Sequence, residues 1–413
     1  MKSETIWDVA VIGGGPAGMM AAGRSAERGH KVVLIEKNAT LGKKLLISGG
    51  GRCNLTNAEA DAKKFLAKFK TGGKFFASPL SRFDTASAVK FFNDRGMPTK
   101  VEALQRVFPL SNSAKSVWDV LVNYLAQGGV TVISNAPVTH IDAKDGRIES
   151  IQLKSGRVVR ARSYIFATGG VSHPETGSTG DGFKWLKSLG HTVKDTDVAL
   201  VPIALKASPL SRAAGVSLQA KITTFQKDVK HDSQIGKILI THVGLSGPAI
   251  LNMSRDIGEL LTYGEVMLEL DLLPSEGYEK VDARLQSILK EHASKKIRNA
   301  LREIVPPALV PVILESAHIG EVECNKVTRK ERVALMKTLK HLRVEVKGLL
   351  GLDKAVTTSG GVSLTEIDFK TMRSLRYLNL YIIGDLLDIN RPSGGYSLQL
   401  CWTTGFVAGS AVT

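Results

Sequence analysis

The sequence predicts an α/β fold in which both ends of the chain form one Rossmann-like domain and the middle of the chain is inserted into it. Three observations predict this arrangement. A strand, a glycine-rich turn, a helix and a second strand follow one another in residues 8–36. Two later apolar runs, residues 164–167 and 380–383, also end in small or glycine residues. From about residue 196 to 352 the pattern changes to short strands and then to helices.

The N-terminal unit has the length and composition of a strand–helix–strand motif. Residues 8–12 (DVAVI) are a short apolar run, as expected for a buried parallel strand. Residues 16–28 are rich in helix formers, and Gly29 is placed to cap that helix. Residues 31–36 (KVVLIE) are rich in β-branched side chains and predict the second strand. The unit spans about 30 residues, which is the usual length of a dinucleotide-binding βαβ motif.

The turn after the first strand carries three glycines in the spacing G-x-G-x-x-G. Gly13 permits the tight turn, Gly15 lets the backbone approach a pyrophosphate, and Gly18 lets the helix pack closely on the strand. Pro16 and Ala17 open the helix, whose free N–H groups and dipole favour a bound phosphate. Strand, turn, helix and second strand agree, so the pattern predicts a dinucleotide site rather than a glycine turn without a ligand.

Glu36 and two later turns indicate which dinucleotide binds. A carboxylate at the end of the second strand accepts hydrogen bonds from ribose hydroxyls and repels a 2′-phosphate, which disfavours NADP. The N-terminal place of the motif, the small residues after Ala167 (Thr168-Gly169-Gly170), and Asp385 after Gly384 favour FAD over NAD. The sequence has no second G-x-G-x-x-G, so NAD(P)H is expected to bind only transiently, as the reductant.

The remaining chain fits around this domain. Residues 84–127 have a mainly helical pattern, and residues 130–166 contain several strand-like runs. Residues 398–413 are apolar and contain glycine, which predicts a helix that closes the first domain. The predicted boundaries are 1–195 and 353–413 for the FAD-binding domain, 196–275 for an inserted β-rich domain, and 276–352 for an inserted helical domain.

A glycine-rich, cationic loop in residues 42–57 is the first candidate for flavin chemistry. Arg52 or Lys44 is suited to stabilising negative charge on a reduced flavin near N1 and O2. The alternative for Arg52 is an ion pair with an acidic side chain. Cys53 is either a proton donor or reactive thiol, or a small buried residue. The cofactor contacts expected from this loop are Lys44, Ser48, Gly49, Gly50, Arg52, Cys53 and Asn54.

Three further side chains are candidate proton donors. His173 and His242 lie in glycine- and threonine-containing turns, where a histidine can act as an acid beside a flavin or can order its loop by a hydrogen bond. Tyr396 is preceded by two glycines and can donate a proton, stack on a base or pack inside the domain. The candidate catalytic residues are therefore Cys53, His173, His242 and Tyr396.

The composition of the chain limits the classes of protein to which it can belong. No apolar run approaches the roughly 18 residues of a membrane helix. The N-terminal residues leave no room for a secretory signal before the first strand, so none is expected. Three cysteines without a Cys-x-x-Cys pair predict neither disulfides nor a metal site, and they favour a reducing cytoplasm. The net charge of +16 indicates either anionic partners, large or small, or a solvated basic surface with no particular partner.

The positive charge is concentrated in two segments. Residues 41–110 hold 13 Lys or Arg against 5 Asp or Glu, a net charge of +8. Residues 324–347 hold 8 against 2, a net charge of +6. The second set recurs mostly at helical spacings, which predicts a basic helix face that tracks phosphates, or alternatively a solvated amphipathic face. Taken together with the resemblance of the chain to a known family, this face is predicted to bind RNA through Lys326, Arg329, Lys330, Lys337, Lys340, Arg343 and Lys347.

Five separated blocks resemble one bacterial flavoprotein family. They are Gly42–Asn57 (GKKLLISGGGRCNLTN), Ala167–Gly182 (ATGGVSHPETGSTGDG), Thr241–Pro248 (THVGLSGP), Thr358–Val362 (TSGGV) and Gly384–Gly405. Together they are similar to the aminoacetone-oxidase-like flavoproteins, a family that includes a ribosomal-RNA dihydrouridine synthase. The last block departs from the family pattern: Asp385 stands where Glu is usual, Ser397 where Asn is usual, and residues 390–393 replace a simpler turn.

The resemblance implies an architecture and a set of cofactor contacts. The architecture is an FAD domain with an inserted β-barrel and an inserted helical domain. The FAD contacts that the resemblance implies include some of those already named. They are Gly13, Gly15, Gly18, Glu36, Lys37, the Lys44–Asn54 loop, Val138, Thr168, Gly169, Gly384, Asp385, Gly395, Tyr396 and Ser397.

Two enzymatic hypotheses and one non-enzymatic hypothesis follow from the residues and the resemblance. The first is an FAD enzyme that reduces a uridine of ribosomal RNA to dihydrouridine with electrons from NAD(P)H, the base leaving its stack to reach the flavin. The second is a small-molecule flavin oxidase or reductase that acts on an amine such as aminoacetone or on an enone. The third is a flavin-binding RNA-associated factor without turnover, which a redox-suited glycine-lined site disfavours.

Overall fold

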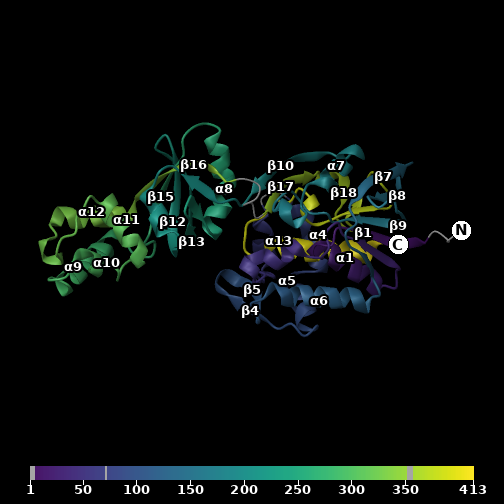
Figure 1. The fold of residues 1–413 in the computed structure, drawn as a ribbon, viewed down its shortest axis with the longest axis horizontal. Coiled ribbons are helices and arrows are strands. Elements are labelled where there is room, and N and C mark those ends of the chain that lie inside the picture. Colours follow the sequence, from purple (N-terminus) through teal and green to yellow (C-terminus); the bar gives the residue numbers. More distant parts are fainter. Residues whose placement is uncertain (1–4, 70–71, 351–356) are drawn as a thin grey trace. The chain divides into compact units, whose positions relative to one another are not determined.

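The computed structural model describes residues 5–69, 72–350 and 357–413 (Figure 1). The chain divides into two compact units, Met1–Val198 with Val356–Thr413, and Ala199–Ala355. Each unit has its own cluster of buried apolar side chains. The predicted domain boundary at residues 352 and 353 lies outside the described residues.

The first unit is built on a sheet whose central strands are parallel. Its order is β18-β19-β20-β9-β1-β2-β6. Strand β1 (Ile6–Ile12) lies between β9 (Val158–Phe166) and β2 (Val32–Ile35), β2 also pairs with β6 (Thr131–Ile133), and β20 (Leu380–Ile382) pairs with β9. The strand that comes late in the sequence thus completes the sheet begun by the first residues. The predicted fold, a Rossmann-like domain formed by both chain ends, is confirmed.

Helix α1 (Pro16–Glu27) packs closely against the C-terminal helix α13 (Tyr396–Ala411) (Figure 1). Glycines make this approach possible. A Cβ on Gly405 would lie 2.5 Å from the carbonyl oxygen of Ala17, and one on Gly409 would meet a carbonyl oxygen of α1 at 2.6 Å. The predicted C-terminal helix therefore closes the domain by backbone contact with the helix of the glycine-rich turn.

The other elements of this unit connect and cover the sheet. They are α2 (Lys43–Ile47), β3 (Thr56–Asn57), α3 (Ala62–Ala67), α4 (Gly73–Arg82), α5 (Thr85–Asn93), β4 (Thr99–Glu102), β5 (Arg106–Pro109), α6 (Ala114–Gln127), β7 (Val138–Lys144), β8 (Arg147–Leu153), α7 (Asp181–Ser188), β10 (Val193–Ala199), β17 (Thr357–Val362), β18 (Ile367–Asp368) and β19 (Arg373–Ser374).

A small antiparallel sheet interrupts the segment that was predicted to be mainly helical. Between α5 and α6, strands β4 and β5 form a hairpin, and β3 pairs with β5 on its other side. Pro98 stands directly before β4 and Pro109 ends β5, and both interrupt the helical pattern because proline removes a backbone donor and restricts the residue before it. The hairpin turn holds Leu104 and Gln105 at φ +61° and +58°.

The second unit contains a closed six-stranded barrel with the order β11-β14-β13-β12-β15-β16. Glycine is required at position 244, where β14 pairs with β11, since a Cβ there would lie 2.0 Å from the carbonyl oxygen of Ile203. Helix α8 (Pro248–Leu261) packs on the barrel. The barrel strands are β11 (Ile203–Leu205), β12 (Ser217–Gln226), β13 (Val229–Ile240), β14 (Gly244–Ser246), β15 (Met267–Asp271) and β16 (Leu342–Leu349).

Helices follow the first five barrel strands. They are α9 (Tyr278–Glu291), α10 (Ile297–Leu301), α11 (Val310–Ser316) and α12 (Arg329–Lys340). Residues 342–349, which the sequence pattern assigned to the helical segment, are instead strand β16, because Leu342, Val344 and Val346 alternate inward with period two. Barrel and helices share one apolar cluster, so they form a single compact unit.

Candidate functional site

A cleft in the first unit opens where the parallel strands β1, β2, β9 and β20 end. Its empty volume is about 1340 Å³ including the open mouth, enough for a ligand larger than most drug-sized molecules. The place agrees with the rule that open parallel sheets bind ligands at the carboxyl ends of their strands. The predicted residues in its lining are Gly13, Gly15, Pro16, Ala17, Glu36, Lys37, Lys44, Ser48, Val138, Thr168, Gly169, Gly384, Asp385 and Ser397.

The glycine turn shapes the floor of the cleft. Gly13 has φ +105°, and a Cβ there would lie 2.5 Å from the carbonyl oxygen of Ala167 on the neighbouring strand end. Gly15 precedes α1 and has open space where its Cβ would stand. Gly18 does not line the cleft; its Cβ would lie 1.9 Å from the oxygen of Gly13, so it serves helix packing. The free N–H groups at the start of α1 therefore face a space that suits a diphosphate.

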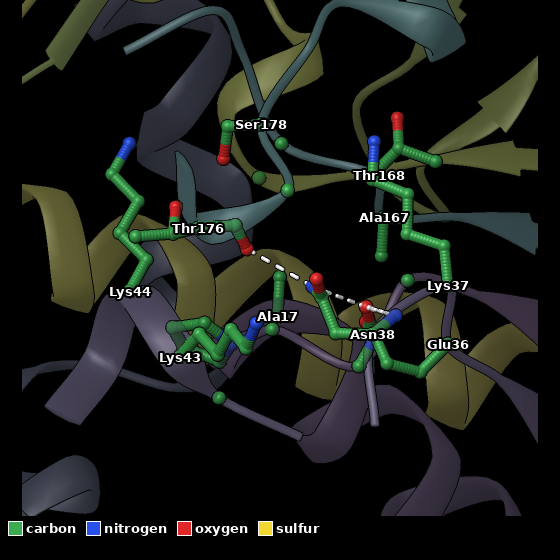
Figure 2. A pocket seen from close by; sticks show the side chains of 18 of the residues that line it. Ala17, Glu36, Lys37, Asn38, Lys43, Lys44, Ala167, Thr168, Thr176 and Ser178 are labelled. Atoms are coloured by element: carbon green, nitrogen blue, oxygen red, sulfur yellow. Dashed lines mark hydrogen bonds between the residues drawn. The ribbon is translucent and has the colours of Figure 1, made fainter. Parts of the chain in front are cut away.

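Glu36 is a nearly buried carboxylate with a fixed position in the cleft. Its Oε2 accepts a 2.7 Å hydrogen bond from the Gly14 N–H, and its Oε1 accepts bonds of 2.8 and 2.7 Å from the backbone and side-chain amides of Asn38. Figure 2 shows the Asn38 amide between Glu36 and Thr176, whose carbonyl oxygen it also contacts at 3.0 Å. Asn38 was not predicted, because a short polar residue after an acidic strand end carries no distinctive pattern.

Lys37 holds in place the loop that contains Thr179 and Asp181, on the opposite wall of the cleft. Its Nζ donates to Thr179 Oγ1 at 2.6 Å and to the Asp181 carboxylate at 2.9 Å. Burial opposes ionisation of Asp181, but the hydrogen bonds from Lys37 and Thr179 hold the pKa of its carboxyl below the usual value. The predicted cofactor residue Lys37 thus orders the wall of the cleft through an ion pair.

A buried ionic cluster lies at the other end of the cleft. The Arg391 side chain is 2% exposed and pairs with Asp385. It also donates to Ile389 O at 2.7 Å and to Ser397 Oγ at 3.1 Å. Lys44 Nζ lies 3.8 Å from Asp385. Burial opposes ionisation of Asp385, but the charges of Arg391 and Lys44 keep its pKa below the usual value. Within residues 390–397, Ser397 lines the cleft, and the buried Arg391 holds Ser397 and Asp385 in place.

These features fit a bound FAD. The Oγ1 atom of Thr168, a lining residue, is buried and has no hydrogen-bond partner among the described residues, so a ligand can supply one. The residues that would hold the dinucleotide are the turn Gly13–Ala17 for its phosphates, Glu36 for a ribose, and Asp385 with Ser397 toward the flavin end. Two polar ends with helix N–H groups between them match a long molecule with a central diphosphate.

The loop after Ser48 does not reach the cleft as predicted. Arg52 Nη2 contacts Glu102 Oε1 at 2.5 Å, and its guanidinium carbon lies 4.2 Å from the centre of the Phe108 ring. The ion pair that was the alternative for Arg52 is therefore present, and the flavin contact of Arg52 stays a prediction. Gly49, Gly50, Cys53 and Asn54 are likewise outside the lining. Cys53 is fully buried, which raises the pKa of its thiol to about 12 and argues against its predicted catalytic role.

The other three catalytic candidates also lie outside the lining. His173 Nδ1 contacts Glu175 Oε1 at 2.8 Å, which is the loop-ordering alternative. Tyr396 is buried beside Phe65, with ring centres 4.9 Å apart, and it packs inside the domain together with the neighbouring Gly395. His242 belongs to the barrel unit and is exposed. No candidate proton donor from the sequence is therefore placed in the cleft.

The predicted basic face is divided between different elements. Helix α12 carries Arg329, Lys330 and Lys337 as exposed residues. Arg343 and Lys347 lie on barrel strand β16, and Lys326 precedes the helix. The prediction is wrong for Lys340, which is 7% exposed. Its Nζ contacts Asp271 at 2.7 Å and donates to two backbone carbonyls, so it holds α12 to the barrel.

Comparison with known families decides the class of the protein. The model of the family described as HI0933-like protein Rossmann domain matches residues 7–411. The chain belongs to this family. Its fold is the Rossmann-type FAD-binding fold, and the family and its full-length relatives place it among the FAD-dependent oxidoreductases.

Two full-length relatives carry different names. The chain is 31% identical over 409 residues to the ribosomal RNA dihydrouridine synthase of Escherichia coli, covering 97% of this chain and 96% of that protein. It is 30% identical over 415 residues to the 3-dehydro-bile acid delta(4,6)-reductase of Clostridium scindens, covering 98% of each. Family membership thus leaves room for more than one substrate.

Among solved structures, 3-ketosteroid delta1-dehydrogenase from Sterolibacterium denitrificans has a similar fold. The TM-score is 0.56 at 14% identity, covering 98% of both chains. This likeness concerns the fold alone. No helix in the described part of the chain has the length and apolar character needed to cross a bilayer.

Proposed function

We propose that this protein reduces a uridine in ribosomal RNA to dihydrouridine, with FAD as cofactor and NAD(P)H as the electron source in the cytoplasm. The observation that carries the proposal is the end-to-end similarity to the relative named ribosomal RNA dihydrouridine synthase. The net charge of +16 supports a polyanionic partner, since two phosphates of FAD do not require so many cations.

The reaction balances with these reactants. A bound FAD would supply, in its reduced form, the hydride that uracil takes up at C6 while a proton adds to C5, and NAD(P)H would return the two electrons. The chain's own part is to hold the dinucleotide through the glycine turn, Glu36 and the Asp385 cluster. Lys43 and Lys44 add positive charge to the lining, where it favours an approaching nucleotide.

A second candidate is the reduction of a small enone. The 30% identity to the bile acid reductase favours it, because both named products require reduction of a carbon–carbon double bond conjugated to a carbonyl group. The two candidates therefore share the flavin chemistry and differ in how the substrate is recognised.

The test is mass mapping of ribosomal RNA from a strain that lacks this gene. We expect one dihydrouridine to disappear and to return when the gene is supplied, and purified protein with FAD and NAD(P)H to restore it in the isolated RNA. Unchanged RNA, together with consumption of NAD(P)H in the presence of a 3-oxo-4-ene steroid, would replace the first candidate with the second.

A further inference from the structure

We propose that Leu104, at the tip of the β4–β5 hairpin, is a wedge that occupies the gap left in the RNA stack when the target uridine moves into the flavin cleft. The inference rests on the proposed function and deepens it by naming the residue that handles the extruded base. It concerns a hairpin that the sequence pattern did not predict and that the cofactor site does not use.

The hairpin tip is exposed, apolar and conformationally strained. The Leu104 side chain is 69% exposed, although leucine is usually buried. Leu104 and Gln105 both adopt positive φ, a region that non-glycine residues rarely enter. Two consecutive residues of this kind at the surface contribute nothing to a core. Backbone strain of this kind clusters at the sites where proteins bind ligands.

Hydrogen bonds connect this tip to the cofactor cleft. The Asn57 side-chain amide donates both to Leu104 O at 3.1 Å and to Gly394 O at 3.2 Å. Ala58 N–H donates to Gln105 O at 2.6 Å, which fixes the other half of the turn. Gly394 lies three residues before Ser397, which lines the cleft. One amide thus holds the leucine tip beside the turn that leads into α13 and the flavin end of the cleft.

The charge around the tip suits a nucleic acid strand. On the hairpin, Lys100 pairs across the strands with Phe108, and Glu102 with Arg106, so these four side chains share one face. Arg52 and Lys100 both pair with the Glu102 carboxylate, and Arg106 stands opposite Glu102 on the neighbouring strand. An excess of positive charge beside an exposed leucine matches a phosphate backbone next to a base stack.

This arrangement supports the insertion of Leu104 into the RNA base stack. A base must leave its stack before it can reach a flavin at the bottom of a cleft, and unstacking requires free energy that an inserted apolar side chain can offset. Leucine is one of the side chains that proteins insert between base steps. The rigid turn keeps Leu104 outside the cleft while the uridine lies inside it.

The test compares Leu104→Gly with the wild-type holoenzyme on ribosomal RNA from the deletion strain. Glycine suits the left-handed turn, so the hairpin keeps its conformation while the side chain is lost. With pre-reduced enzyme in single turnover, we expect dihydrouridine to form about tenfold more slowly, the scale of one lost wedge contact. The RNA dissociation constant and the reoxidation of reduced FAD by dioxygen should stay unchanged.

Two further variants serve as controls for Leu104→Gly. Leu104→Met keeps an apolar side chain and should retain the wild-type rate, whereas Leu375→Ala alters a comparably exposed leucine (60%) and should have no effect. An unchanged rate for Leu104→Gly, or a change in RNA affinity alone, would overturn the wedge. If the wild-type enzyme forms no dihydrouridine, the proposed function fails and the inference falls with it.

Discussion

Glu36 uses most of its hydrogen-bonding capacity on the protein itself. An ionised carboxylate offers about four acceptor positions, and three are taken by the Gly14 N–H and the two amides of Asn38. The remaining position suits one ribose hydroxyl. The same residue therefore shapes the glycine turn and binds the cofactor, so that both functions depend on its charge.

Glu36→Gln is the direct test of this residue. The amide keeps the shape but places an NH₂ group against donor N–H groups, so at least one charge-assisted bond is lost. We expect the FAD dissociation constant to rise at least tenfold, about 1.4 kcal/mol, in a titration of apoprotein. Glu149→Gln, an exposed carboxylate on β8, is the control. Equal affinities in the two variants would remove Glu36 from the site.

A second carboxylate, Glu366, stabilises the fold away from the cleft. It accepts bonds from His191 Nδ1 at 2.7 Å, Arg376 at 2.9 Å and the Thr192 N–H at 3.1 Å. Burial opposes its ionisation, but these donors lower its pKa from 4.5 to about 2. Burial lowers the pKa of His191 despite the neighbouring carboxylate, and its Nε2 lies 3.0 Å from the Ser374 hydroxyl.

This shift predicts a pH dependence of stability. A carboxyl with a lowered folded-state pKa stabilises the protein fully above about pH 4.5 and loses that contribution as the pH falls toward 2. We therefore expect Glu366→Gln to lower the free energy of unfolding by about 1–3 kcal/mol at pH 7. The difference from wild type should shrink below pH 4.5, as measured by denaturant unfolding. A deficit that persists undiminished at pH 2 would contradict the assignment.

At the scale of elements, the contact between α1 and α13 depends on glycine. Gly405→Ala would place a methyl group 2.5 Å from a carbonyl oxygen of α1, so the helices must separate at the turn that carries the phosphate site. We expect a loss of about 1–3 kcal/mol in the free energy of unfolding, and weaker FAD binding. Gly320→Ala, where an added Cβ meets no atom within 4 Å, should leave both unchanged. Similar melting of the two variants would refute the requirement.

Helix α12 offers a test of RNA contact by the inserted unit. Lys330 and Lys337 are exposed, and within the described residues neither has an ion-pair partner, so they are free to contact phosphates. The double variant Lys330→Glu/Lys337→Glu should weaken RNA binding and reduce the slope of log K against log salt by about two. Lys280→Glu/Lys290→Glu on α9 makes the same charge change nearby. Identical losses in both variants would indicate a general charge effect rather than a surface on α12.

At the scale of the whole molecule, two separate apolar clusters each stabilise one of the two compact units. One belongs to the unit that contains the cleft, and the other joins the barrel with its helices. Cooperative unfolding follows such cores, so two transitions are expected rather than one.

Calorimetry with and without FAD tests this division. All residues that line the cleft belong to the first unit, so FAD should raise the midpoint of one transition and leave the other in place. At a hundredfold excess over the dissociation constant the stabilisation is about 2.7 kcal/mol. A single transition that shifts as a whole would show that the two units unfold together.

The sequence by itself determined the dinucleotide motif and the closure of the domain by the last helix. Gly13, Gly15 and Glu36 stand at fixed spacings within one local βαβ unit, so their roles follow from nearby residues. The inserted β-rich and helical segments were likewise visible as changes in hydrophobic period.

Tertiary structure decided which polar residues face the cleft. The spacing of Arg52, Cys53 and Lys340 suggested chemistry, but each found its partner or its burial through residues distant in the sequence. Arg391 pairs with the cleft residues Asp385 and Ser397, and Asn57 links Leu104 to Gly394, only because α13 packs against β3. Periodicity reports which face of an element is apolar; the packing of other elements decides what that face meets.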